Sequence, residues 1–412
     1  MHYNDEKILT THAGSLIRPH ELREFVSTIQ KDKPYNEIEF LQCLSKSVEK
    51  IVAEQCTCGI DIVSDGEFGK LISWSQYPLR RLSGFECQPI SNINPFKAGA
   101  DRERFKEFYA ELDKDQPVAT VTETVCVGPI KYTGTKELQR DINNFKTALK
   151  KVQVCEGFLP VAAPASVIPD RRNEYYRNER DCLDAIAGAM ALEYRAIINA
   201  GLILQLDDAR AAVTFDRMVP PASLDDYRKW LTDHVEITNQ ALDGIPPEKV
   251  RYHVCWGSWP GPHCTDVPLK EIIDLILQIN AGAYVIEGAN PRHEHEWKIW
   301  KDVDLPEDKI LIHGVVSHST NVVEHPELIA ERIVRIANLI GRERVIAGTD
   351  CGFAQGPLYQ RVHPSIMWAK LEAMTGQATG WRGCGGIRFA TTKEELDWFR
   401  YVEGISRNIG FR

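Results

Sequence analysis

The sequence lacks a long hydrophobic run and a secretory signal. Its most apolar helical stretch, residues 185–204, is interrupted by Glu193 and Arg195, whereas a membrane-spanning helix needs about 20 mostly apolar residues. The opening residues, MHYNDEKILTTHAG, lack the charged-then-apolar pattern of a signal peptide. We therefore expect a cytoplasmic protein with no membrane partner.

The sequence also lacks a long run of one charge sign. Its net charge is −9 with 26% charged residues, and a nucleic-acid partner would favour a basic face. Eleven cysteines without a secretory signal indicate reduced thiols rather than a disulfide framework. The hydrophobic content of 43% is ordinary for a globular protein with a substantial core. These features predict a folded protein that binds no nucleic acid.

Short β-branched runs recur along the chain, and most are followed by a helical pattern. The predicted helices include residues 183–201, 269–282 and 325–341, of which the last two end in glycine. The predicted strands are residues 8–15, 60–67, 157–166, 202–209, 250–257, 283–290, 310–317 and 344–352.

Repeated strand–helix alternation predicts an α/β fold of the (β/α)8 TIM-barrel class. An open doubly wound sheet is the alternative, but no glycine-rich phosphate loop follows an early strand. Residues 84–150 fit the alternation poorly, with a charged helical segment, ADRERFKEFYAELDKD, and a strand-like one, VATVTETVCVGPIKYTG. We interpret them as an insertion between strands 2 and 3 of a single domain that spans residues 1–412.

Polar and reactive residues gather where the predicted strands end. Burying such groups without partners costs free energy, and TIM barrels build their active sites at the carboxyl ends of the strands. The residues concerned are Ser15, Asp65, Glu67, Asp207, Asp208, His253, Cys255, Glu287, His318 and Cys351.

Four of these residues predict a zinc site. His253 and Cys255 are two residues apart on one predicted strand, so both side chains point to the same face. Glu287 and Cys351 end other strands and can converge on the same ion. An imidazole and two thiolates with an exchangeable fourth position suit catalytic Zn²⁺ better than magnesium or calcium.

Other cysteines and histidines are alternative ligands. Cysteine is often a small buried hydrophobe, and we expect Cys56 and Cys58, at the end of a helix, to be structural. The remaining alternatives are His263 with Cys264, in the loop after the fifth strand, and His293 with His295, for which we expect a surface-facing helix start.

The motifs together resemble the catalytic barrel of cobalamin-independent methionine synthase, and more closely its single-barrel branch, which includes epoxyalkane:coenzyme M transferase. The resemblance covers nearly the whole chain, through THAGSLIRP, VSDGEF, LQLDDA, HVCWGSWPGPH, EGANPRHEHEW, HGVVSHSTNVVEHPE and AGTDCGF. It implies zinc-dependent transfer of a methyl or other alkyl group to a thiol.

The resemblance also implies residue roles. The family's zinc ligands match His253, Cys255, Glu287 and Cys351. Its groups that hold the amino acid part of homocysteine match Ser15, Glu67 and Asp207, and its proton-donating histidine matches His318. Trp256 and Trp259 can close over the substrate and exclude water, or pack their loop against the barrel rim.

The alkyl donor stays open. The segment VAAPASVIPD lacks the tryptophan–serine signature of folate binding, and DCGF is not followed by a Lys-Thr-Arg stretch. Candidate donors are a methylfolate, a methylcorrinoid protein and an epoxide. Glu67 and Asp207 favour an amino-acid thiol over a sulfonate such as coenzyme M. Alternatives of other classes are a metal-independent barrel of the uroporphyrinogen decarboxylase type and a non-catalytic zinc-binding protein.

Overall fold

A computed structural model describes residues 7–89, 98–115, 122–259 and 261–376. Eight strands form one sheet in the order β1-β11-β10-β9-β8-β7-β5-β2. The pairs β1–β11, β11–β10, β10–β9, β8–β7 and β5–β2 are parallel. These strands are β1 (Leu9–Thr10), β2 (Ile62–Ser64), β5 (Glu156–Ala162), β7 (Ile203–Asp208), β8 (Val250–Val254), β9 (Ala283–Ile286), β10 (Ile310–Val316) and β11 (Val345–Thr349).

The two end strands of the sheet are joined by hydrogen bonds. The backbone N–H of Asp61 donates to the Thr10 carbonyl at 3.1 Å, and the Thr11 hydroxyl donates to the Ile62 carbonyl at 2.9 Å. The sheet is therefore a nearly closed barrel of the TIM type, and the predicted fold class is confirmed. All eight predicted strands are present, although each is shorter than its predicted range.

The chain forms two compact units, the first of which comprises Met1–Phe68, Asn144–Leu159 and Gly282–Arg412. Its helices are α1 (His20–Gln30), α2 (Glu37–Thr57), α10 (Pro326–Ile340) and α11 (Pro364–Thr375). Helix α10 ends at Gly341, whose φ of 92° favours glycine. The predicted stop of this helix is thus confirmed.

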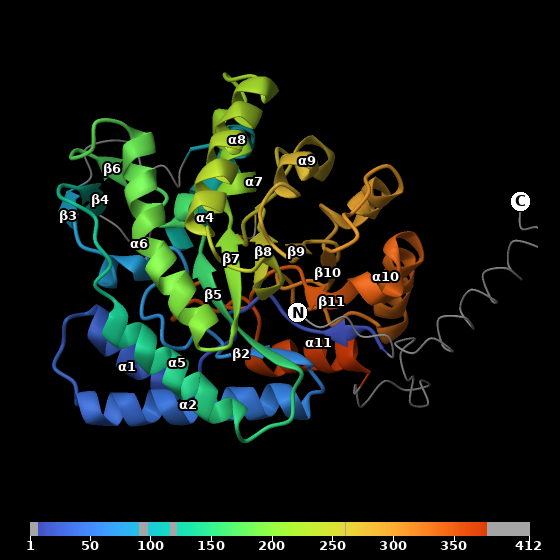
Figure 1. Cartoon of the computed structure of the whole chain (residues 1–412), viewed down its shortest axis with the longest axis horizontal. Helices are drawn as coiled ribbons and strands as arrows, with labels where there is room; N and C mark the ends of the chain where they lie inside the picture. Colours follow the sequence, from blue (N-terminus) through green and yellow to red (C-terminus); the bar gives the residue numbers. More distant parts are fainter. Residues whose placement is uncertain (1–6, 90–97, 116–121, 260, 377–412) are drawn as a thin grey trace, which may run out of the picture. The chain divides into compact units, whose positions relative to one another are not determined.

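The second unit comprises Gly69–Asn143 and Pro160–Ala281. It contains α6 (Glu179–Asn199), α7 (Arg210–Met218) and α8 (Leu224–Ala241), and Figure 1 shows α6 and α8 side by side. Helix α8 begins with a capping box, in which the side chains and backbone N–H groups of Ser223 and Asp226 bond reciprocally.

The predicted helix over 269–282 is wrong in extent. The segment forms a 3-10 turn, Leu269–Glu271, and a short helix, α9 (Ile273–Ile276). Ile272 lies between them at φ −130° and ψ −17°, which is not helical. The apolar residues of this segment are mostly buried, as an amphipathic pattern predicts. A turn followed by a short helix can bury residues at this spacing as well as one continuous helix can.

The segment predicted as an insertion contains a small sheet and helices. The charged stretch forms α3 (Ala100–Arg104) and α4 (Lys106–Asp115), and the strand-like stretch contains β4 (Thr122–Cys126). Strand β4 pairs antiparallel with β3 (Phe85–Pro89) and parallel with β6 (Arg172–Asn173), and α5 spans Thr135–Leu149. Strand β6 lies beyond residue 150, so the small sheet also takes residues from after β5.

An ion network lies in the interior of the second unit. The Arg81 guanidinium contacts Glu193 Oε1 and Asp141 Oδ2, each at 2.6 Å, and the three side chains are at most 8% exposed. Burial lowers the pKa of Arg81, but the two carboxylates more than offset this and raise it above its ordinary value. The network joins α5 and α6 to the residue that follows the 3-10 helix Tyr77–Arg80.

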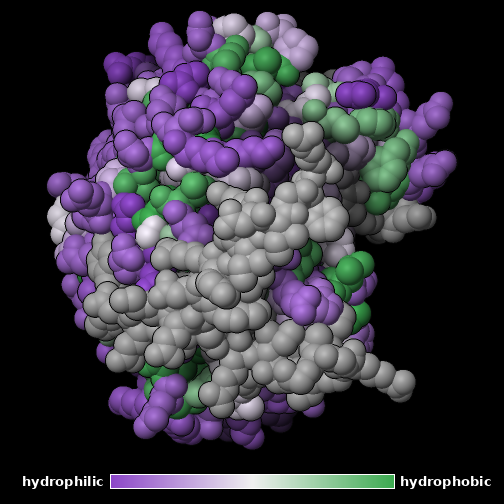
Figure 2. Space-filling view, turned by 90° about the vertical axis from the view of Figure 1, so that its right-hand side faces the viewer, coloured by the Kyte–Doolittle hydropathy of each residue, from purple (hydrophilic) through white to green (hydrophobic). Residues whose placement is uncertain are grey.

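The surface in Figure 2 is mainly hydrophilic, and its hydrophobic areas are small and separate from one another. Among the described residues, no helix has the length and apolar character needed to cross a membrane.

Candidate metal centre

Strand β8 places His253 in the interior, where it is 2% exposed. The strand ends at Val254, three residues earlier than predicted, so Cys255 is the first residue after it. The backbone N–H of Cys255 still donates to the Asp208 carbonyl at 3.2 Å, which continues the contact with β7. His253 and Cys255 therefore keep the two-residue spacing that directs side chains to one face.

The neighbouring strand fixes the imidazole of His253. Asp207 on β7 pairs in register with His253, and its Oδ1 lies 3.0 Å from His253 Nδ1. The same oxygen accepts a hydrogen bond from Gln205 Nε2 at 2.7 Å. A carboxylate on one ring nitrogen sets the tautomer and orients the other nitrogen. This contact leaves Nε2 as the ring nitrogen that could bind a metal ion.

The Cys255 thiol is held by the loop that follows it. The backbone N–H of Gly257 donates to Cys255 Sγ at 3.3 Å, and the Ser258 hydroxyl lies 3.9 Å from the same sulfur. The side chain is buried, so these contacts replace water as its partners.

Cys351 lies two residues beyond the end of β11, and not on the strand as predicted. The Thr349 hydroxyl donates to the Cys351 carbonyl at 3.0 Å and accepts a hydrogen bond from the backbone N–H of Ala13 at 3.1 Å. These bonds turn the chain, so that the thiol is 8% exposed.

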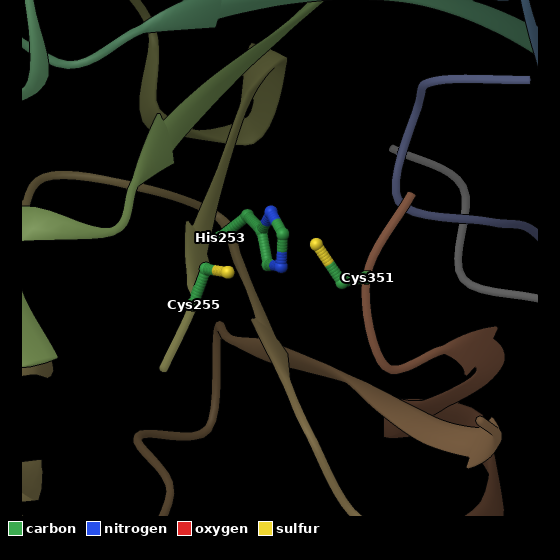
Figure 3. A group of neighbouring side chains, drawn as sticks. All are labelled: His253, Cys255 and Cys351. Carbon is green, nitrogen blue, oxygen red and sulfur yellow. The ribbon is translucent and has the colours of Figure 1, made fainter. Parts of the chain in front are cut away.

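His253, Cys255 and Cys351 form a buried group in which one ligand atom from each lies within 4.8 Å of the others. Figure 3 shows the two sulfur atoms on either side of the imidazole, with one ring nitrogen turned toward them. One imidazole and two thiols are a typical donor set for a catalytic zinc ion, which binds three protein ligands and keeps one position open. Three of the four predicted ligands are thus brought together, and they fit zinc.

Glu287 follows β9 and is not a member of this group. Its Oε2 accepts hydrogen bonds from Asn290 Nδ2 at 2.6 Å and Arg292 Nη2 at 3.1 Å, and its side chain is fully buried. Charge-assisted hydrogen bonds of this kind are strong. The described contacts of Glu287 thus come from its own loop.

Asp350 was not predicted, and it ties that loop to β11. Its Oδ1 accepts hydrogen bonds from the backbone N–H groups of Gly288 and Ala289, both at 2.8 Å, and its Oδ2 from Asn290 Nδ2 at 2.9 Å. A Cβ at Gly314 would lie 2.2 Å from Asp350 Oδ1, so β10 needs glycine there. The carboxylate gave no distinct sequence signal beyond its place next to Cys351.

Ser15 and Glu67 lie close to the ends of β1 and β2, both 5% exposed. Ser15 Oγ accepts a hydrogen bond from the backbone N–H of Ala354 at 3.2 Å, which places it against the loop after Cys351. Glu67 has a φ of 63°, uncommon for a residue other than glycine. Arg18 donates to the Glu67 carbonyl; burial lowers the pKa of Arg18 to about 10, and the charges of Glu67 and Asp65 oppose that shift.

His318 follows β10 and is 1% exposed. The residue before it, Ser317, donates its backbone N–H to Glu324 Oε1 at 2.8 Å, and the other Glu324 oxygen contacts Lys370 Nζ at 2.8 Å. Burial lowers the pKa of Lys370, and Glu324 opposes that shift. The Glu324–Lys370 pair therefore anchors the loop that carries His318.

Trp256 is 1% exposed, and its Nε1 donates to the Val267 carbonyl at 2.8 Å. These contacts fit the alternative in which Trp256 packs its loop, whereas Trp259 is more exposed.

The alternative ligands have other surroundings. His263 Nδ1 lies 3.1 Å from Asp266. His293 directly precedes the 3-10 helix Glu294–Lys301, but it is buried, with Nδ1 2.8 Å from Glu296, so the predicted surface-facing position is wrong for this residue. Burial raises the pKa of Cys58 to about 12, as suits a structural thiol. The remaining three, Cys56, Cys264 and His295, are also outside the one group of possible metal ligands found among the described residues.

The fold and this group define the chain as an α/β barrel with a buried His/Cys/Cys site able to hold a metal ion. Residues 160–370, just over half of the chain, match the family "Cobalamin-independent synthase, Catalytic domain". The chain belongs to this family.

Curated relatives cover most of the chain. It is 24% identical over 351 residues to a methionine synthase of Saccharolobus solfataricus, an alignment that covers 83% of this chain and 87% of that protein. It is 22% identical over 364 residues to a 2-hydroxypropyl-CoM lyase of Xanthobacter autotrophicus, with 80% and 84% covered.

Two solved structures share the fold. A B12-independent methionine synthase from Shewanella sp. W3-18-1, in complex with selenomethionine, aligns with a TM-score of 0.67 and 16% identity over 90% of this chain and 96% of that one. A putative vitamin-B12 independent methionine synthase from Listeria monocytogenes aligns with a TM-score of 0.60 and 18% identity over 90% and 97%.

Proposed function

We propose that the protein is a zinc-dependent enzyme that transfers a methyl or other alkyl group to a small thiol. The observation that carries the proposal is the buried group of His253, Cys255 and Cys351 in a chain of the cobalamin-independent synthase family. These three residues hold the metal. When bound, zinc supplies a Lewis acid that favours the thiolate form of the substrate at neutral pH.

The protein's own residues do the remaining work. Glu287 would be the fourth ligand of the ion, at a position that the substrate sulfur could also take, and hydrogen bonds from Asn290 and Arg292 hold its carboxylate. Ser15 and Glu67 bind the amino acid part of the thiol, and Asp207 keeps His253 oriented.

In the transfer, the substrate sulfur attacks an alkyl carbon in line, so that a sulfur–carbon bond forms while the bond from that carbon to its leaving atom breaks. The leaving atom is nitrogen in a methylfolate, oxygen in an epoxide and cobalt in a methylcorrinoid, and cobalt keeps the electron pair without a proton. For a leaving nitrogen or oxygen, a ring nitrogen of His318 gives the proton, a contribution of about 10²–10⁴-fold for general acid catalysis. The buried loop around His318 is anchored by Glu324. It keeps the proton-donating imidazole close to the reaction and away from bulk water.

The favoured substrate is homocysteine or a similar amino-acid thiol, because Glu67 suits a cationic amino group. The donor is a methylfolate, a methylcorrinoid protein or an epoxide. A second candidate reaction is the joining of a sulfonated thiol to an epoxide or its reverse, favoured by the likeness to the 2-hydroxypropyl-CoM lyase. Both reactions use the same metal-binding group.

The test is to load the purified full chain with zinc and incubate it with homocysteine and, separately, with coenzyme M. Each thiol is offered a methylfolate, a methylcorrinoid and an epoxide, and products are identified by mass. We expect about one zinc per chain and one alkylated thiol. A folded chain that binds no zinc would overturn the proposal in favour of a metal-independent barrel, and a zinc-loaded chain that alkylates no thiol would favour a non-catalytic zinc protein.

Asp207→Ala is expected to weaken zinc binding by about 10–100-fold, the usual cost of removing the partner of a metal-binding histidine. The reason is that His253 Nδ1 loses the carboxylate that fixes the ring. The measurement is a zinc dissociation constant from competition with a chromophoric chelator.

The matched control is Glu296→Ala, which removes a similar carboxylate–histidine contact of 2.8 Å at His293, outside the metal-binding group and outside the loop that follows β8. This control should keep the wild-type zinc affinity. Equal affinities for wild type and Asp207→Ala would show that Asp207 does not orient the ligand.

A further inference from the structure

The chain after β8 forms a loop that begins at the Cys255 thiol. We call residues Gly257–Trp259 and Gly261–Thr265 the β8 loop. Gly257 donates its N–H to Cys255 Sγ from a backbone φ of 89°, a conformation that favours glycine. A Cβ at Gly257 would lie 1.8 Å from the Trp259 ring. The position of Trp259 and the bond to the thiol therefore depend on the same backbone.

The other end of the β8 loop is held by Asp101 on α3. Asp101 Oδ2 accepts the backbone N–H of His263 at 3.1 Å, and Oδ1 accepts that of Cys264 at 3.0 Å. The carboxylate is 2% exposed, and Tyr109 on α4 donates its hydroxyl to Oδ2 at 2.8 Å. A buried carboxylate with three donors is fixed in position, and it fixes both loop residues.

Trp259 connects the two ends of the loop. Its Nε1 donates to the Tyr109 hydroxyl at 3.2 Å, and its ring stacks on the His263 ring with centroids 4.1 Å apart. The Trp259 carbonyl lies 3.0 Å from His263 Nε2. A continuous series of contacts thus runs from Asp101 through Tyr109 and His263 to Trp259, which lies against Gly257.

A second carboxylate holds α3 itself in place. Asp216 Oδ1 accepts the backbone N–H of Asp101 at 2.9 Å and also the hydroxyl of Thr265. A Cβ at Gly99 would lie 2.0 Å from Asp216 Oδ2, so the approach of the chain to Asp216 requires glycine. Asp216 therefore holds both Asp101 and the end of the β8 loop, which keeps the two next to each other.

We propose that Asp101 is a positioning residue for the metal centre. It fixes the β8 loop so that the Gly257 N–H points at Cys255 Sγ and holds the thiol in one orientation toward the ion. The inference rests on the proposed function, since it requires zinc on Cys255. It gives the segment between β2 and β5 a role in the reaction: its helices support a ligand from outside the barrel strands.

The test compares zinc release and the cobalt spectrum of the full chain with those of Asp101→Ala. We expect Asp101→Ala to release zinc to a chelator about 10–100-fold faster, as for other residues that orient a ligand. With Co²⁺ as the probe, its thiolate-to-cobalt absorption should shift or weaken, because the Cys255 sulfur loses its fixed orientation. The control is Glu103→Gln, also on α3, whose carboxylate contacts only Lys106 at the surface; it should match wild type.

Two further variants separate positioning from general damage. Tyr109→Phe keeps the Asp101 carboxylate and removes its bond to the tyrosine hydroxyl. It should change the zinc release rate and the cobalt spectrum in the same direction as Asp101→Ala, but by a smaller amount. Gly257→Ala should reproduce the cobalt spectrum of Asp101→Ala, and the double variant should add little, because both act on one contact.

Wild-type zinc release and an unchanged cobalt spectrum in Asp101→Ala would overturn the inference and leave the proposed function intact. If Asp101→Ala does not fold, wild-type values in Tyr109→Phe would overturn it equally. A wild-type chain that binds neither Zn²⁺ nor Co²⁺ would overturn the proposed function, and the inference with it.

Discussion

Cys255→Ser is expected to lose both bound zinc and thiol alkylation. A serine hydroxyl is a poor replacement for a thiolate ligand, and His253 and Cys351 alone do not complete a site with three protein ligands. The rate should fall by about 10³-fold or more, which corresponds to about 4 kcal/mol of activation free energy. The measurements are zinc content by mass spectrometry and product formation at saturating thiol.

The control for this variant is Cys264→Ser, which changes an exposed thiol of the same loop. It should keep wild-type zinc content and rate, whereas Cys351→Ser, in the segment after β11, should behave as Cys255→Ser does. Turnover by zinc-free Cys255→Ser protein would contradict the mechanism, because the thiol would then be activated without the metal.

Arg81→Met is expected to have the largest effect on stability, a loss of about 3–5 kcal/mol in the free energy of unfolding. The substitution removes the cation that the buried carboxylates of Glu193 and Asp141 share, of which Asp141 keeps its contact with Arg140. The hydroxyl of Tyr77, 3.2 Å from Glu193 Oε1, cannot compensate a full negative charge. Urea unfolding at pH 7 measures the change.

Arg140→Met is the control, because Arg140 contacts the same Asp141 at 2.7 Å from a more exposed position. An ion pair that water can reach contributes about 0–1 kcal/mol, so this variant should unfold near the wild-type urea concentration. Replacing Arg81, Glu193 and Asp141 together by apolar residues should recover much of the loss. Equal losses for Arg81→Met and Arg140→Met would contradict the assignment of the cost to buried charge.

The sequence predicted the barrel and three clustered metal-ligand candidates because both depend on strand order. Runs such as 310–317 are apolar on both faces, as buried parallel strands require, and the polar residues that follow them identify one end of the barrel. The two-residue period of a strand was enough to predict that the side chains of His253 and Cys255 lie on the same face. The group with Cys351 followed from the rule that barrel strands bring their carboxyl ends together.

The parts that were missed depend on contacts between distant segments. Asp101 contacts His263 across 162 positions of sequence, and no periodic pattern links the two. The bond between Glu287 and Arg292 depends on how the five residues after Glu287 turn. The strands also end earlier than predicted, since the β-branched residues that favour strands continue into the loops. The predicted roles of Glu287 as a ligand, of Ser15, Glu67 and Asp207 in substrate binding and of His318 as the proton donor stay predictions.

The pairing of β1 with β11, Leu9 opposite Ile346 and Thr10 opposite Ala347, has a consequence for biosynthesis. A ribosome makes a chain from its amino terminus, so β1 is complete long before its sheet partner exists. Contacts between segments this far apart form slowly because a long loop must close first. Cys351 follows the last of the eight strands, so its thiol joins His253 and Cys255 only after all eight strands have been made. We therefore expect metal loading to follow the synthesis of β11, with zinc supplied to a barrel whose strands are all present.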